Sequence, residues 1–187
     1  AVALLGCAPE PAPPAPGPGR PGGKLNLVVV LSDALRAANL PLYGYRRPTA
    51  PRLERLARGG VLFPHHLASS SLTPVSVSQM MTGRVAPPIL MSAHFRLAPV
   101  RAADDELLVL PRVLAARGYR TALVSAHPWF DEGARLIEDF ESVRVIEPSE
   151  KTREKPYAWF EELLPAVREE LAAGAADPRP FFLYVHS

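Results

Sequence analysis

The sequence predicts an α/β domain with a mostly parallel sheet and helices on both faces of that sheet. Residues 25–31 form a continuous apolar run rich in β-branched side chains, which is typical of a strand buried on both faces of a parallel sheet. Residues 119–125 are predicted to form a further strand, and residues 181–186 a final apolar one. Helical patterns separate these runs along the chain, and strands that alternate with helices indicate a parallel sheet.

Prolines and glycines mark the ends of the predicted helices. Pro51 suits the first position of a helix, and Gly59 follows its last turn. Pro74 and Gly83 bound the next helix in the same way. The predicted helices are 51–58, 74–82, 107–117 and 157–173, the last interrupted by Pro165, and weaker strands are predicted at 61–67 and 143–146.

The overall composition is that of a globular domain. The chain has 187 residues, 48% of them hydrophobic and 21% charged, which is enough for one domain with a core. The formal net charge is +2 and there is no long basic run, so the composition gives no support for nucleic-acid binding. No apolar run is long enough to span a membrane as a helix.

The first 23 residues predict a lipid anchor and a tether. Residues 4–7, Leu-Leu-Gly-Cys, resemble a bacterial lipobox at the end of a signal peptide, in which Cys7 would be acylated. The alternative is a short apolar N-terminus with an incidental cysteine. Residues 8–23 contain seven prolines and four glycines, which favours an extended linker. We therefore expect a protein outside the cytoplasm, in the periplasm or at the cell surface, anchored by lipid to a bacterial membrane.

Asp33 is a candidate metal ligand. It follows the strand predicted at 25–31, which the sequence marks as the most buried strand, and ligands of open α/β sheets bind beyond the carboxyl ends of the strands. A carboxylate there is costly unless a positive charge compensates it. A calcium, magnesium, manganese or zinc ion would do so. The alternative is that Asp33 caps the turn at 34–36, and its position alone favours neither.

Thr73 is a candidate nucleophile. It directly precedes Pro74, so its ordinary interpretation is an N-cap of the helix at 74–82. A hydroxyl at a helix N-terminus also lies where backbone N–H groups favour an anion. A neighbouring metal ion would lower the pKa of that hydroxyl and activate it for attack.

Several segments, taken in order, resemble the sulfatases of the alkaline-phosphatase superfamily. Residues 26–36, Asn-Leu-Val-Val-Val-Leu-Ser-Asp-Ala-Leu-Arg, are similar to the family's first strand, which leads into a metal-binding Asp and then Leu-Arg. Residues 73–83 fall on the family's nucleophile helix, which closes on Thr-Gly. The other similar segments are Tyr43-Gly44-Tyr45, residues 49–57, Gly60-Val61-Leu62-Phe63 and Gly118-Tyr119-Arg120-Thr121.

The resemblance implies that residues 24–187 are the N-terminal part of a sulfatase-like domain, an incomplete fragment of an alkaline-phosphatase-like fold. It implies a divalent metal bound by Asp33, a nucleophile at Thr73 and a substrate contact from His127, which otherwise is a loop histidine. The remaining metal ligands are expected beyond residue 187, so the 187 residues by themselves are expected to be inactive.

Two departures from the family pattern change the expected chemistry. Sulfatases oxidise a Cys or Ser to formylglycine within Cys/Ser-x-Pro-Ser-Arg, whereas residues 73–77 read Thr-Pro-Val-Ser-Val. Threonine is not a formylglycine precursor, so no formylglycine is expected. The family's double Asp is reduced to Asp33-Ala34.

Three functions follow from this pattern. The first is a metal-dependent hydrolase of sulfate or phosphate esters, with an anionic ester as substrate. The second is a transferase of the phosphoethanolamine or phosphoglycerol type, because those enzymes resemble this chain in a Thr-x-x-Ser-x segment and use the Thr to form a covalent phospho-enzyme. The third is a non-catalytic sulfatase-like lipoprotein, which Ala34 and Val77 favour. The sequence leaves the substrate, the choice of metal and the oligomeric state open.

Overall fold

The computed structural model describes residues 23–85, 108–127, 130, 138–150 and 158–187. The chain divides into two compact units, Ala1–Gly23 with Arg36–Pro64, and Lys24–Leu35 with His65–Ser187. Cys7 and the linker up to residue 22 lie outside the described residues. Among the helices that the structure describes, none has the length and apolar character to cross a membrane.

The larger unit contains a parallel sheet, as predicted. Its strands are β1 (Leu27–Leu31), β2 (Arg120–Ser125), β3 (Ser142–Val145) and β4 (Phe181–His186). They lie in the order β1-β4-β2-β3, and every neighbouring pair is parallel. The strand predicted at 61–67 is wrong, because that segment is largely exposed and Pro64 within it cannot donate to a ladder.

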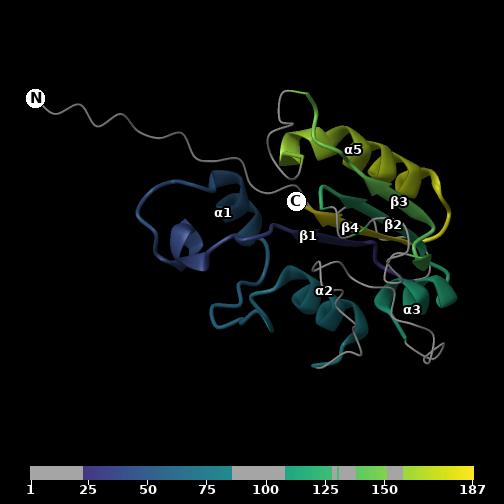
Figure 1. The fold of residues 1–187 in the computed structure, drawn as a ribbon, viewed down its shortest axis with the longest axis horizontal. Coiled ribbons are helices and arrows are strands. Elements are labelled where there is room, and N and C mark those ends of the chain that lie inside the picture. The colour runs from purple at the N-terminus through teal and green to yellow at the C-terminus, as the bar shows by residue number, and fades with distance from the viewer. Residues whose placement is uncertain (1–22, 86–107, 128–129, 131–137, 151–157) are drawn as a thin grey trace, which may run out of the picture. The chain divides into compact units, whose positions relative to one another are not determined.

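Helices cover both faces of this sheet (Figure 1). Side chains alternate along a strand, so Phe182 and Tyr184 join one apolar cluster while Phe181 and Leu183 join another. The first cluster lies against α2 (Thr73–Thr82) and α3 (Leu110–Ala116), and the second against α5 (Phe160–Ala176). Gly174 of α5 permits this close packing, since a Cβ at that position would lie 2.7 Å from Phe181 Cδ1. The predicted helices at 74–82, 107–117 and 157–173 are confirmed, with shifted ends, but the predicted interruption at Pro165 is wrong, because α5 runs through this residue.

One prediction about the sheet is wrong. The strand at 25–31 was expected to be buried on both faces, yet Val28 is 49% exposed and Val30 60% exposed. Among the described strands, β1 pairs with β4 alone and therefore forms an edge. The fully buried strand is β4, whose six residues are all buried between β1 and β2. Asp33 thus follows an edge strand rather than the most buried one.

The smaller unit is built from short helical turns. It contains η1 (Ala37–Asn39), η2 (Pro41–Tyr43) and α1 (Pro51–Ala57). The Thr49 hydroxyl donates to the carbonyl of Asn39 at 2.6 Å and links the two ends of this segment. The helix predicted at 51–58 is confirmed by α1, which has Pro51 in its first turn.

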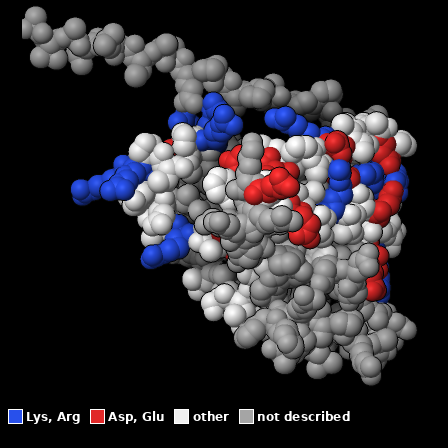
Figure 2. Space-filling view, turned by 45° about the horizontal axis from the view of Figure 1, so that its top comes forward, with Lys and Arg blue, Asp and Glu red and all other residues white. Residues whose placement is uncertain are grey.

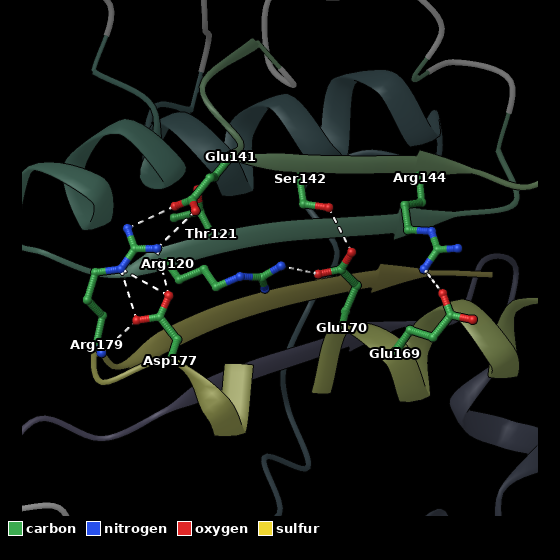
Figure 3. A network of polar contacts seen from close by, with 9 residues as sticks. All are labelled: Arg120, Thr121, Glu141, Ser142, Arg144, Glu169, Glu170, Asp177 and Arg179. Carbon is green, nitrogen blue, oxygen red and sulfur yellow. Dashed lines mark hydrogen bonds and ion pairs between the residues drawn. The ribbon is translucent and has the colours of Figure 1, made fainter. Parts of the chain in front are cut away.

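A network of charged side chains ties α5 to the amino-terminal ends of β2 and β3 (Figure 3). The Arg120 guanidinium donates to one Glu170 oxygen at 2.6 Å, and the Ser142 hydroxyl donates to the other at 2.7 Å. Arg144 pairs with Glu169 nearby. Toward the right of Figure 2, basic and acidic side chains likewise lie next to one another on the surface. In the same network, the Arg179 guanidinium donates to the carboxylates of Glu141 and Asp177.

The Glu170 carboxylate is held in its charged form. Burial raises its pKa, but the hydrogen bonds from Ser142 and Arg120 and the charges of Arg120 and Arg144 outweigh that effect. The net pKa of Glu170 lies below its ordinary value of 4.5. A carboxylate whose pKa is lowered on folding stabilises the fold above the unfolded pKa, and that stabilisation is lost as the pH falls through the folded pKa.

We expect Arg120→Met to lower the free energy of unfolding by about 3 kcal/mol, because it removes the guanidinium from a buried carboxylate. Arg144→Met is the matched control, since its partner Glu169 is 65% exposed and such surface pairs contribute at most about 1 kcal/mol. Urea denaturation of the full-length protein measures both. The deficit of Arg120→Met should shrink as the pH falls below 4.5. Equal losses in the two variants at neutral pH would contradict this role for Glu170.

Candidate active site

Asp33 lies in a tight turn just after β1. Its backbone N–H donates to the carbonyl of Ser187 at 2.7 Å, which fixes the turn to the end of β4. Its Oδ1 accepts the N–H of Ala34 at 2.8 Å, and Ala34 has a left-handed backbone with φ of +53°. The turn-capping interpretation of Asp33 is therefore confirmed. It does not exclude metal binding, because an ionised carboxylate has about four acceptor sites and one N–H uses one of them.

Thr73 is the first residue of α2, and its side chain points to Asp33. The Thr73 hydroxyl lies 3.1 Å from Asp33 Oδ1 and 3.2 Å from Oδ2 and donates to this carboxylate. Leu72 holds the N-cap position, and its side chain makes no capping hydrogen bond. The N-cap interpretation of Thr73 is thus wrong, since its hydroxyl is engaged by a carboxylate from another element.

A cavity of about 270 Å³ lies beside these two residues. Its described wall carries hydroxyl groups and one carboxylate but no lysine or arginine. The N-terminus of α2 opens toward it, and backbone N–H groups there favour an anion. The lining consists of Leu31, Ser32, Asp33, Ala34, Leu35, Ala68, Ser70, Ser71, Thr73, Ser76 and Val77.

His127 reaches the same carboxylate from the end of β2. Its Nε2 lies 3.4 Å from Asp33 Oδ2, and its side chain is 6% exposed. Its backbone N–H donates to the Ser125 hydroxyl at 2.9 Å. Burial lowers the pKa of His127, and the charge and hydrogen bond of Asp33 oppose this without overcoming it. The structure therefore brings together Asp33, Thr73 and His127, all three of the predicted site residues that it describes.

Sequence reasoning did not assign a role to His186, the last residue of β4. Its ring stacks on that of His127, with centroids 5.2 Å apart, and it is fully buried. Burial lowers the pKa of His186 to about 4, the charge of His127 adds to this effect, and Asp33 opposes it. Burial, followed by the charge of Asp33, also raises the pKa of Tyr184 two residues earlier. The available signal in the sequence was a histidine that ends an otherwise apolar strand.

The oxygen atoms at the site could supply some of the ligands of a hard divalent cation. Asp33 and Thr73 supply carboxylate and hydroxyl oxygens, which calcium, magnesium and manganese prefer and zinc accepts. Within the described ranges, no group of three or more His, Cys, Asp or Glu side chains could hold a metal ion. These residues therefore fit one side of a metal site. Val77, where formylglycine motifs carry an arginine, is 3% exposed and packs in the core with Met81.

Residues 25–187 match the family model described as Sulfatase. The chain belongs to the sulfatase family. Steryl-sulfatase of Mus musculus is 35% identical to it over 127 residues, which are 65% of this chain and 19% of that protein. The chain thus spans about a fifth of the length of this relative.

Solved structures agree with the family match. The C-terminal periplasmic domain of EcEptC from Escherichia coli, in complex with Zn, superposes with a TM-score of 0.61 and 18% identity, covering 87% of this chain and 43% of that one. A protein of the alkaline phosphatase superfamily from Vibrio parahaemolyticus gives a TM-score of 0.63 and 20% identity, covering 90% and 40%. The sulfatase-family chain described here therefore has the predicted alkaline-phosphatase-like α/β fold and forms part of such a domain.

Proposed function

We propose that this protein is a metal-dependent hydrolase of sulfate or phosphate esters, with Thr73 as its nucleophile. One observation carries the proposal. The Thr73 hydroxyl lies 3.1 Å from the Asp33 carboxylate on the wall of a cavity, at the N-terminus of α2. Membership of the sulfatase family supports the ester class. The residues that the structure describes supply only part of the site. The proposal therefore concerns the activity of the full-length protein.

In the proposed reaction, the anionic group of the ester binds at the N-terminus of α2, where backbone N–H groups face it. Thr73 Oγ forms a bond to the sulfur or phosphorus atom, and the bond from that atom to the ester oxygen breaks. The departing alcohol takes up the proton that Thr73 loses. Water then cleaves the Thr73 ester. Asp33 and Thr73 would hold a divalent cation, which supplies Lewis acidity when it is bound.

His127 is proposed to contact the substrate. Its Nε2 already lies beside the Asp33 carboxylate, so its ring faces the position where the anion would bind. In the neutral form favoured by its burial, the Nε2–H donates to an oxygen. A substrate oxygen that enters beside Asp33 would meet this donor.

A transferase is the second candidate, and Thr73 itself favours it. Transferases of the phosphoethanolamine and phosphoglycerol type, which residues 73–77 resemble in a Thr-x-x-Ser-x segment, use the Thr to form a covalent phospho-enzyme. An alcohol in place of water would then receive the group from Thr73. The non-catalytic alternative rests on Ala34, which replaces a second Asp of the family pattern, and on the buried Val77.

The location outside the cytoplasm is part of the proposal. The Escherichia coli neighbour is a periplasmic domain, which supports an extracytoplasmic site for this fold. Acylation of Cys7 would anchor the chain, and the linker at 8–23 would separate the anchor from the domain. Globomycin, which blocks lipoprotein signal cleavage, should then cause a larger precursor to accumulate, and Cys7→Ser should abolish labelling with a fatty acid.

A covalent adduct on Thr73 is the expected result of acid quenching. The full-length protein is incubated with 4-nitrophenyl sulfate or 4-nitrophenyl phosphate and with each of Ca²⁺, Mg²⁺, Mn²⁺ and Zn²⁺, and its peptides are analysed by mass spectrometry. We expect a sulfo or phospho group on the peptide that contains Thr73. Added glycerol separates the two enzymes by their main product, because a transferase passes most of the group to glycerol as glycerol phosphate or glycerol sulfate, whereas a hydrolase releases most of it as free phosphate or sulfate. If no adduct and no nitrophenol form with any of the four metals, the result supports the non-catalytic alternative.

A further inference from the structure

The end of β4 lies between the two segments that carry Asp33 and His127. The N–H of Asp33 donates to the carbonyl of Ser187 at 2.7 Å, on the β1 side. The N–H of Ala126 donates to the carbonyl of His186 at 2.9 Å, on the β2 side. The backbone at 186–187 therefore fixes the positions of both site residues at once.

The His186 ring also lies between the two site segments, in the layer of side chains between the sheet and helices α2 and α3. In the sheet register, His186 pairs with Leu31 of β1 and with Ser125 of β2, so its side chain lies on the face that α2 and α3 cover. The ring stacks on His127 at a centroid distance of 5.2 Å and an interplanar angle of 24°. Phe130 at 5.5 Å and Tyr184 at 6.0 Å meet it edge to face. The His186 ring is therefore packed against three other rings.

The polar atoms of His186 do not explain its place in the core. It is fully buried, and neither of its ring nitrogens has a hydrogen-bond partner within the described part of the chain. A buried polar group without a partner destabilises a fold, so a role is needed to account for it. The contact that His186 does make with the site is the stack on His127, whose Nε2 faces Asp33 at 3.4 Å.

We propose that His186 is a positioning residue that fixes the plane of the His127 ring, so that His127 Nε2 faces the Asp33 carboxylate and the substrate. The stack restricts rotation about the last side-chain bond of His127, and the hydrogen bond from the His127 backbone to Ser125 restricts its main chain. The role of His186 in turnover rests on the proposed function, whereas its effect on the His127 ring does not.

Two substitutions separate the ring of His186 from its polar atoms. His186→Phe keeps a flat ring without nitrogens, and His186→Asn keeps polar atoms without a ring. We expect His186→Asn to lower kcat by about 10-fold, because partners that orient a functional histidine typically contribute 10–100-fold, with a small change in KM. We expect His186→Phe to stay close to wild type. Phe140→Leu is the matched control, since it removes a stack of 5.8 Å with Phe182 from the same core.

The His127 ring itself gives a readout that needs no turnover. In metal-free full-length protein labelled with ¹⁵N-histidine, we expect the His127 Nε2–H signal in wild type, His186→Phe and Phe140→Leu, and its loss in His186→Asn. Thermal melts identify any variant that fails to fold. If His186→Phe is that variant, the folded His186→Asn protein decides the question by itself. A retained signal and kcat in His186→Asn, or equal losses in His186→Phe and His186→Asn, would overturn the positioning role. If wild type turns over no ester, the proposed function fails while the His127 signal still tests His186.

Discussion

Replacing Thr73 with alanine is expected to lower turnover by the full-length protein at least about 10³-fold, because removing the nucleophile of a covalent mechanism leaves only binding and electrostatic effects. The expectation rests on the direction of the Thr73 hydroxyl, which points to the Asp33 carboxylate at 3.1 Å instead of capping its own helix. Steady-state release of nitrophenol from the aryl ester that wild type accepts measures the change. Thr73→Ser should retain part of the activity, since it keeps a hydroxyl at the same position.

Thr82→Ala is the matched control for this substitution. Thr82 ends the same helix, and its hydroxyl donates to the Ser78 carbonyl at 2.7 Å, outside the lining of the cavity. We expect Thr82→Ala to keep wild-type kcat. Thr73→Ala should unfold within about 1 kcal/mol of wild type, since it loses one solvent-accessible hydrogen bond and no helix cap. Full activity in a folded Thr73→Ala would show that Thr73 is not the nucleophile.

The sequence predicted most elements of the fold correctly but assigned the greatest burial to the wrong strand. The strands predicted at 25–31, 119–125 and 181–186 are observed at Leu27–Leu31, Arg120–Ser125 and Phe181–His186. Periodicity reports how apolar a segment is, but strand order depends on pairing between distant segments. An edge strand and a central strand of a parallel sheet can therefore read alike. β1 was expected to be the most buried strand, and among the described strands that is β4.

The candidate site could be predicted where a residue lies at the end of a strand or helix. Asp33 follows β1 and Thr73 begins α2, so general rules for α/β folds and the family resemblance both indicated them. The contact between them was not predictable, because it joins residues 40 positions apart through tertiary packing. For the same reason Thr73 was given an N-cap alternative that the structure contradicts.

His186 shows the other limit of sequence reasoning. In the printed sequence it is a single histidine after Val185, within residues 180–187, which resemble the family only weakly. Its stack on His127 exists only because β2 and β4 are neighbours and end at the same level, with Ser125 opposite His186. The burial and the absence of a described partner for its nitrogens, both invisible in the sequence, are what single it out.

Asp33→Asn is expected to weaken divalent-metal binding by at least about 100-fold. Outer partners of metal ligands already contribute 10–100-fold to affinity, so a direct carboxylate ligand should contribute at least as much. The amide keeps the size of the side chain, and its oxygen can still accept the Ala34 N–H that Asp33 accepts at 2.8 Å. The change therefore removes the negative charge and leaves the turn in place. A fall in turnover should accompany the loss of metal.

Calorimetric titration of the full-length protein with Ca²⁺, Mg²⁺, Mn²⁺ and Zn²⁺ measures this effect and identifies the preferred ion. Glu169→Gln is the matched control, because it also neutralises a carboxylate but at a side chain that is 65% exposed and paired with Arg144 on the far side of the sheet from α2. Wild type and Glu169→Gln should bind metal equally. Equal affinity in Asp33→Asn would mean that the carboxylate serves the turn and the Thr73 hydroxyl alone, and the metal-dependent mechanism would lose its first ligand.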